Sequence, residues 1–105
     1  MEILYIMTRQ DHLLVILMEE CAEVQKECAK ALRFGLDDYY APAGDDTNRE
    51  SIVKELDDLI AVVEMLEDED ILEPGSFDRQ ELKKEKVEKF LKYSKAKGLL
   101  EEKVL

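Results

Sequence analysis

The stretch LLVILMEECAEVQKECAKALRFG, residues 13–35, decides the fold. Its apolar residues recur every three or four positions, which is the spacing of one face of an α-helix. Thr8 and Asp11 precede it with the spacing of a capping pair, and Gly35 stands where the pattern stops. We therefore predict a helix over residues 8–34. Its apolar stripe comprises Leu14, Leu17, Cys21, Val24, Cys28 and Leu32.

The rest of the chain adds two more helices and a long loop. Residues 36–48, LDDYYAPAGDDTN, contain proline and glycine and predict the loop. A second amphipathic run follows through residue 66, capped by Thr47 with Glu50 or by Asn48 alone. A third helix is predicted over residues 78–97, capped by Asp78 and Glu81 and ended by Gly98. No strand pattern is found, so the prediction is a single all-α domain, residues 1–105, folded as an antiparallel helical bundle.

Charge and hydropathy exclude several classes of partner. The chain has 26 acidic and 15 basic side chains, a net charge of −11, which repels nucleic acid and anionic membrane surfaces. No run approaches the ~20 apolar residues of a membrane span. The first residues, MEILYIMTRQDH, lack the basic region and cleavage site of a signal peptide. We expect a cytoplasmic protein that binds neither nucleic acid nor membrane.

The short chain also predicts self-association. A chain of 105 residues buries only about two-thirds of its unfolded surface, and three helices make a thin core. We expect a homodimer or homotetramer to complete the bundle. Cys21 and Cys28 lie about 10 Å apart along one helix, too far to bridge each other. They are predicted to be reduced thiols in the core.

Two pairs of carboxylates occupy matching positions on the first two helices. On a helical wheel, Glu20 lies about 80° from the centre of the apolar stripe and Glu23 about 60° further round. Glu55 and Asp58 take nearly the same angles on the second helix. If the helices pack with these flanks adjacent, four carboxylates converge.

Four partly desolvated carboxylates cannot all stay ionised without a cation, and oxygen ligands in that number suit Mg²⁺ or Mn²⁺. An acidic chain also produces such spacings by chance, as in the pairs Glu64/Glu67 and Glu85/Glu88. The matched angles on two helices distinguish the chosen pairs. A di-iron bundle would require Glu-x-x-His pairs, which are absent from the sequence, and His12 is its only histidine.

The motifs EECAEV and KELDDL, in that order on consecutive helices, resemble the paired ExxE and ExxD signature of MazG-like all-α nucleoside triphosphate pyrophosphohydrolases. That superfamily includes phosphoribosyl-ATP pyrophosphohydrolases and dimeric dUTPases. The likeness covers residues 13–67. One departure is Asp57, which stands before the final acid where the family often has a small residue.

The resemblance implies Mg²⁺-dependent hydrolysis of a nucleoside triphosphate at the α–β linkage, giving a monophosphate and pyrophosphate, with Mn²⁺ able to substitute. It implies Glu20, Glu23, Glu55 and Asp58 as metal ligands. Glu20, Glu23 or neighbouring Glu19 would orient or deprotonate the attacking water. This chemistry needs charge neutralisation and positioning more than a covalent nucleophile.

Several further residues are candidates for binding the substrate. Lys30 and Arg33 follow the first motif and could bind phosphate oxygens, or could simply favour a helix C-terminus. Phe34, Tyr39 and Tyr40 could stack a base or anchor the loop. The remaining candidates are Asn48 on the loop and Lys86, Lys89 and Tyr93 on the third helix.

Two questions stay open from the sequence. The sequence does not reveal the preferred base and sugar, although the loop between the motif helices is expected to determine that preference. The alternative to an enzyme is a non-catalytic acidic helical protein, such as a DNA mimic or regulatory partner, for which a net charge of −11 is suited. Such a protein should scatter acids over an exposed face rather than place them beside core stripes.

Overall fold

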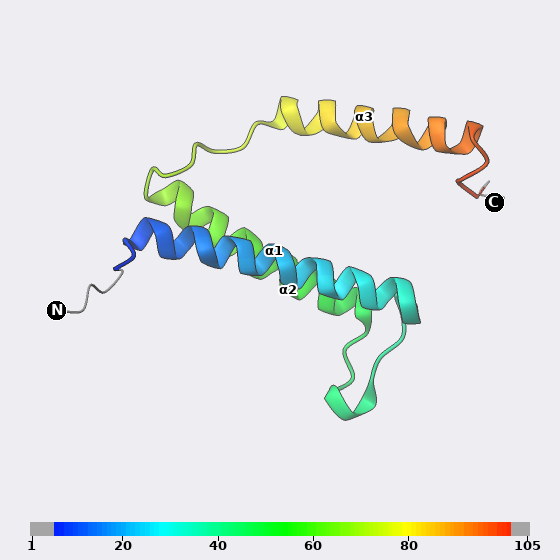
Figure 1. Ribbon diagram of the computed structural model, residues 1–105, viewed down its shortest axis with the longest axis horizontal. Helices are drawn as coiled ribbons and strands as arrows, with labels where there is room; N and C mark the ends of the chain where they lie inside the picture. Colours follow the sequence, from blue (N-terminus) through cyan, green and yellow to red (C-terminus); the bar gives the residue numbers. More distant parts are fainter. Residues whose placement is uncertain (1–5, 102–105) are drawn as a thin grey trace. The chain divides into compact units, whose positions relative to one another are not determined.

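The computed structural model describes residues 6–101 and is all-helical over that range. It contains α1 (Arg9–Phe34), a short 3₁₀ helix η1 (Ala41–Ala43), α2 (Asn48–Asp68) and α3 (Phe77–Ala96). The chain divides into two compact units, Met1–Glu73 and Pro74–Leu105. The first unit is a helical hairpin of α1 and α2 joined by the loop (Figure 1).

The ends of α1 and α2 confirm the predicted capping. The hydroxyl of Thr8 accepts a hydrogen bond from the Asp11 backbone N–H at 3.1 Å, and the Asp11 carboxylate accepts one from the Thr8 N–H at 3.3 Å. Thr47 and Glu50 form the same reciprocal box at the start of α2. Gly35 ends α1 at φ +104°, a conformation that side chains disfavour. Local sequence therefore sets these helix bounds.

The two helices of the hairpin run antiparallel and pack along a single seam (Figure 1). Along each helix, the less exposed side chains recur with alternating spacings of three and four residues, as in a coiled-coil seam. On α1 these seam positions are Leu13, Leu17, Glu20, Val24, Glu27 and Ala31. On α2 they are Ile52, Glu55, Leu59, Val62 and Leu66.

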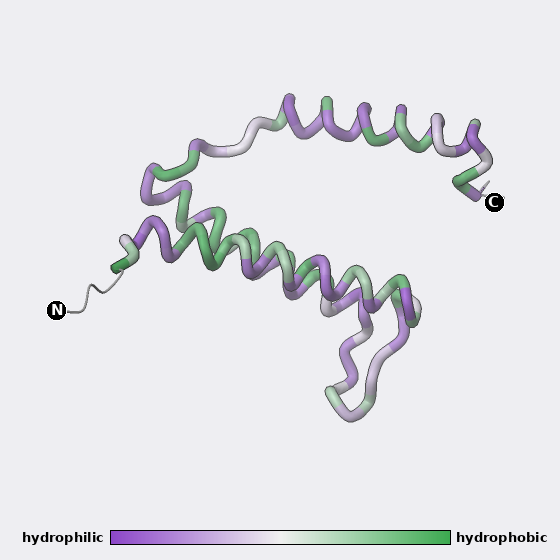
Figure 2. The backbone as a smooth tube through the Cα atoms, viewed as in Figure 1, coloured by the Kyte–Doolittle hydropathy of each residue, from purple (hydrophilic) through white to green (hydrophobic). Residues whose placement is uncertain are grey.

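The apolar core lies at one end of this seam. Leu13, Val62 and Leu66 are buried, with Leu14, Leu17 and Ile71 packed against them. Figure 2 shows this as hydrophobic colour where the start of α1 lies beside the end of α2. The apolar residues thus fasten the open end of the hairpin, while the middle of the seam carries acids.

The structure corrects the predicted stripe of α1. Cys21, Cys28 and Leu32 are exposed, Leu32 to 90% of its area, so the two thiols are not core residues of the described chain. The packing stripe keeps Leu17 and Val24, but at every other position it takes the residue before the predicted one, so that it passes through Glu20 and Glu27. The sequence pattern misled because α1 is apolar on two adjacent faces, and a two-helix unit buries only one.

The second unit is built around α3. Ser76, and not the predicted Asp78 and Glu81, caps this helix: its hydroxyl accepts from the Arg79 N–H at 3.2 Å. The helix carries a solvated, mostly charged surface with no buried residue. The segment after Gly98, residues 99–105, lies partly outside the described residues. Across residues 6–101, no helix is long and apolar enough to cross a membrane.

Candidate metal centre

Three of the four predicted metal ligands come together in the middle of the hairpin. One carboxylate oxygen from each of Glu20, Glu55 and Asp58 lies within 4.8 Å of the others. Glu20 and Glu55 are partly buried, and Asp58 is exposed. Two helices therefore contribute to one acidic cluster, open to solvent on one side.

The seam explains why these side chains meet. Leu13 packs near Leu66 at one end of an antiparallel pair. Continuing that register along the seam brings Glu55 level with Val24, so that acids on α1 lie one turn to either side of it. Asp58, three residues after Glu55, projects from nearly the same side of α2. Helix packing itself gathers the carboxylates.

Partial burial and the neighbouring acids raise the pKa of Glu55 above its ordinary value. Loss of water around the partly buried carboxyl is the main cause, followed by repulsion from Asp58, Glu23, Glu20 and Glu27 in that order. Its negative charge is therefore disfavoured in the folded chain. A divalent cation would reverse that balance, because it favours the ionised form of every carboxylate around it.

Glu27 is an acid that sequence reasoning did not place in the site. It is only 7% exposed, and the structure describes no other buried polar or charged residue in residues 6–101. Its oxygens accept hydrogen bonds from Lys30 Nζ at 3.4 and 3.5 Å, which compensates part of its charge. Seam positions alternate by three and four residues, and Glu27 follows Val24 by three. Continuing this spacing beyond Val24 would therefore have identified Glu27.

The remaining acids of the two motifs lie outside the group of three. Glu23 is exposed, and its charge contributes to the raised pKa of Glu55. Glu19 is exposed and points about 100° away from Glu20 around the helix. Asp57, the residue that departs from the family pattern, is exposed as well and does not join the cluster.

The cluster fits a small divalent cation. Oxygen ligands lie about 2.1 Å from Mg²⁺, so two oxygens in one shell are at most about 4.2 Å apart. Neighbouring oxygens of such a shell are about 3.0 Å apart, so the oxygens of Glu20, Glu55 and Asp58, which lie within 4.8 Å of one another, would close the shell by moving inward by up to about 1 Å each. Carboxylates supply the hard oxygen donors that Mg²⁺ and Mn²⁺ prefer.

The predicted substrate contacts divide between the two units. Lys30 lies one turn beyond Glu27 and is paired with it, whereas exposed Arg33 lies 4.8 Å over the ring of Phe34. Asn48 is the first residue of α2, capped by Thr47, and donates from Nδ2 to the Gly35 carbonyl at 2.9 Å. Lys30 and Asn48 thus both lie at the loop end of the hairpin.

The other predicted contacts lie on α3. Lys86 Nζ lies 5.9 Å from the centroid of the Phe90 ring, and Lys97 Nζ lies 5.6 Å from that of Tyr93. Lys89 is exposed. These residues belong to the second unit, whose cations contact aromatic rings of the same helix.

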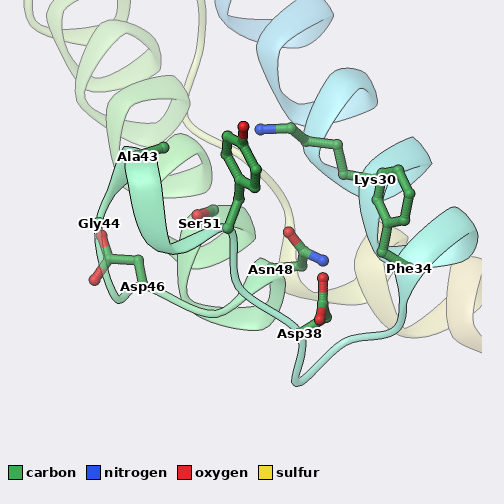
Figure 3. Close-up of a pocket in the computed structure, with 9 residues that line it drawn as sticks. Lys30, Phe34, Asp38, Ala43, Gly44, Asp46, Asn48 and Ser51 are labelled. Atoms are coloured by element: carbon green, nitrogen blue, oxygen red, sulfur yellow. The ribbon is translucent and has the colours of Figure 1, made fainter.

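A cavity of about 490 Å³ opens at the loop end of the hairpin (Figure 3). Lys30 and Phe34 reach it from α1, and Asn48 and Ser51 from the start of α2. Lys30 also pairs with Glu27, which lies two turns after Glu20 of the acidic cluster on α1. The loop completes the wall with Asp38, Tyr40, Ala43, Gly44 and Asp46.

Comparison of the chain with protein-family models, with curated proteins and with solved structures found no match. The assignment of a function therefore depends on the two acidic motifs, the geometry of the acidic cluster and the cavity.

Proposed function

We propose that this protein is a Mg²⁺-dependent nucleoside triphosphate pyrophosphohydrolase. The single observation that carries the proposal is the meeting of Glu20, Glu55 and Asp58 from two consecutive helices, with oxygens within 4.8 Å. These are three of the four acids that the resemblance to MazG-like enzymes designates as ligands. Glu20 and Glu55 occupy seam positions, where unneutralised acids would weaken helix packing, and this supports a cation-binding role.

In this proposal Glu20, Glu55 and Asp58 hold the ion. When bound, Mg²⁺ neutralises charge on the phosphates and lowers the pKa of coordinated water. Glu23, at the edge of the cluster, accepts the proton of the attacking water; exposed Glu19 is the further candidate. The water oxygen bonds to the α-phosphorus, the bond to the bridging oxygen breaks, and pyrophosphate leaves.

The cations of the hairpin serve the phosphates. Lys30 lines the cavity and donates a hydrogen bond to Glu27. Its ammonium group has further N–H donors, which can bind a phosphate oxygen while the bond to Glu27 is kept. Arg33 lies one turn further along α1 and offers bidentate donors at a more exposed position. Lys86, Lys89 and Tyr93 of α3 stay predicted substrate contacts.

We further propose that the active form is a homodimer or homotetramer in the cytoplasm. The hairpin has only three buried apolar side chains, while large apolar residues on both helices stay exposed. A core that small does not stabilise a domain alone, so further apolar surface has to be covered. The exposed apolar residues of α1 and α2 include Ile16, Met18, Leu32, Val53, Leu56, Ile60 and Met65.

The deciding experiment is a panel of ribo- and deoxyribonucleoside triphosphates incubated with Mg²⁺ or with a chelator. The proposal expects at least one nucleotide to give the monophosphate and pyrophosphate in equal amounts, with turnover lost in chelator. Release of a diphosphate and orthophosphate would contradict the α–β assignment. No hydrolysis of any nucleotide would favour the non-catalytic acidic protein.

A further inference from the structure

We infer that the cavity at the loop end of the hairpin binds the nucleobase and selects bases bearing an exocyclic amino group over bases with a carbonyl at that position. This inference rests on the proposed function, because it concerns the substrate of the same site. It names a substrate class that neither acidic motif specifies: cytosine or adenine nucleotides in preference to uracil or hypoxanthine nucleotides.

The position of the cavity supports the assignment to the base. Lys30 lines the cavity, pairs with Glu27 and lies about 15 Å along the α1 axis from Glu20 of the acidic cluster. A substrate with its phosphates at the cluster and Lys30 would extend its nucleoside toward the loop. Phe34 and Tyr40 line this end and expose 59% and 73% of their area, so each offers a ring for stacking.

Asn48 presents a hydrogen-bond acceptor to the cavity. Its Nδ2 donates to the Gly35 carbonyl at 2.9 Å, an interaction that requires the nitrogen, and not the oxygen, to face that carbonyl. The amide orientation is thereby fixed, and Oδ1 is left as the group available to a ligand. Figure 3 shows the Asn48 oxygen turned away from the nitrogen and toward the interior of the cavity.

Asp38 presents a second acceptor. Its backbone carbonyl accepts from the Asn48 N–H at 2.9 Å, and the Leu36 carbonyl accepts from the Arg49 N–H at 2.8 Å, so this part of the loop is fastened to α2. Within residues 6–101 the structure gives the Asp38 carboxylate no hydrogen bond or ion pair. An ionised carboxylate can only accept.

These two acceptors determine the preference. An exocyclic amino group has two N–H donors and can donate to both oxygens, whereas uracil and hypoxanthine offer one ring N–H beside a carbonyl, so one of the two acceptors is left facing that carbonyl. Lys30, a donor that also lines the cavity, is assigned to the phosphates in the proposed function, and the remaining polar wall groups do not oppose the preference. The Asp46 carboxylate is paired with Lys54, and the hydroxyls of Ser51 and Tyr40 can donate or accept.

The test uses nucleosides, because their binding requires neither metal nor hydrolysis. Deoxycytidine and deoxyuridine differ in the amino or carbonyl group and in the adjacent ring nitrogen, which is an acceptor beside the amino group and an N–H donor beside the carbonyl. Deoxyadenosine and deoxyinosine form a second such pair. Titrations of the full chain followed by NMR should give a preference of roughly 10- to 100-fold for the amino member of each pair, the usual contribution of a hydrogen bond to a charged acceptor. Asp38→Asn, whose amide can also donate, should reduce that preference at least about tenfold.

Asp37→Asn is the matched control, since this neighbouring carboxylate pairs with Arg49 at 3.1 Å outside the cavity wall. It should keep the wild-type preference. Circular dichroism of each variant checks that the helices persist. Equal binding of both members of each pair, or a preference unchanged in Asp38→Asn, would overturn the inference.

The outcomes separate the two proposals. An amino preference without hydrolysis of any triphosphate would contradict the pyrophosphohydrolase and leave the base cavity standing. Hydrolysis of dCTP and dUTP with equal kcat/KM, together with equal nucleoside binding, would contradict the cavity and leave the hydrolase standing.

Discussion

Glu20 on α1 and Glu55 on α2 face each other across the helix seam, with a carboxylate oxygen of each within 4.8 Å of the other. Both occupy positions that the seam spacing would otherwise give to apolar residues. Two like charges this close, partly removed from water, oppose the packing of the helices that carry them. A function that uses their negative charge explains why the chain places them there.

The Glu55→Gln substitution tests the role of the cluster in both activity and stability. Loss of a ligand to the ion should lower kcat/KM at least about 100-fold, since metal stabilisation of the transition state amounts to several kcal/mol. Without divalent cation the variant should unfold at a higher temperature than the wild type, because a carboxyl with a raised pKa destabilises the fold while ionised. Thermal unfolding and pyrophosphate release measure the two effects.

The stability gain of Glu55→Gln should shrink as the pH falls through the raised pKa of Glu55, since the wild-type group then becomes neutral as well. Asp57→Asn, an exposed acid beside the cluster, is the control and should retain wild-type turnover. Full activity in Glu55→Gln would remove this carboxylate from the site.

The ion pair between Arg9 and Glu69 predicts that acid destabilises the hairpin, which is the opposite of the effect expected from Glu55. Arg9 Nε donates to Glu69 at 2.7 Å, joining the start of α1 to the end of α2, and this hydrogen bond lowers the pKa of Glu69. The pair therefore stabilises the hairpin above the ordinary glutamate pKa and loses that contribution as the pH falls through the lowered value.

Glu69→Gln should unfold more readily than the wild type at neutral pH and show a smaller further loss of stability on acidification. Denaturant unfolding at a series of pH values measures this. Glu64→Gln, at an exposed carboxyl of the same helix, should follow the wild-type curve. Parallel acid profiles for Glu69→Gln and wild type would contradict the prediction.

Leu66 is the most deeply buried side chain described, with 0% exposed area. Its replacement by alanine should lower the free energy of unfolding by about 2–5 kcal/mol, the usual effect of emptying a core leucine site. Leu99→Ala, at a position 82% exposed, should change it by less than about 0.5 kcal/mol. Equal effects of the two substitutions in denaturant unfolding would place the core elsewhere.

Self-association can be tested at Ile60, which exposes 52% of its area on α2. If a second copy covers this apolar surface, Ile60→Glu would bury a charge at the interface and should convert the oligomer to a monomer. Light scattering coupled to size-exclusion chromatography measures the mass of each form. A wild-type protein that elutes as a monomer would contradict the proposed oligomer.

The sequence predicted what local interactions determine. The capping boxes at Thr8 and Thr47 and the glycine end of α1 require only neighbouring residues, and the structure confirms them. Three of the four designated acids also meet, although Glu20 and Glu55 do so within the seam and not on its flank as the wheel predicted.

The sequence failed where the choice between faces depends on the partner helix. Because α1 is apolar on two sides, periodicity selected the stripe through Cys21 and Cys28, whereas α2 packs on the face that contains Glu27. The cavity was also beyond prediction, since hydrogen bonds between the loop and α2 bring Asp38 and Asn48 together. Neither relationship follows from a spacing within one helix.

The most direct measurement is the binding of Mn²⁺, a paramagnetic substitute for Mg²⁺, followed by electron paramagnetic resonance in the wild type and in single variants. The account predicts one class of site per chain that is weakened at least about tenfold by Glu20→Gln or Asp58→Asn. Asp57→Asn and Glu64→Gln should bind as the wild type does. Equal Mn²⁺ affinity in all five proteins would contradict the claim that the two helices hold a divalent ion between them.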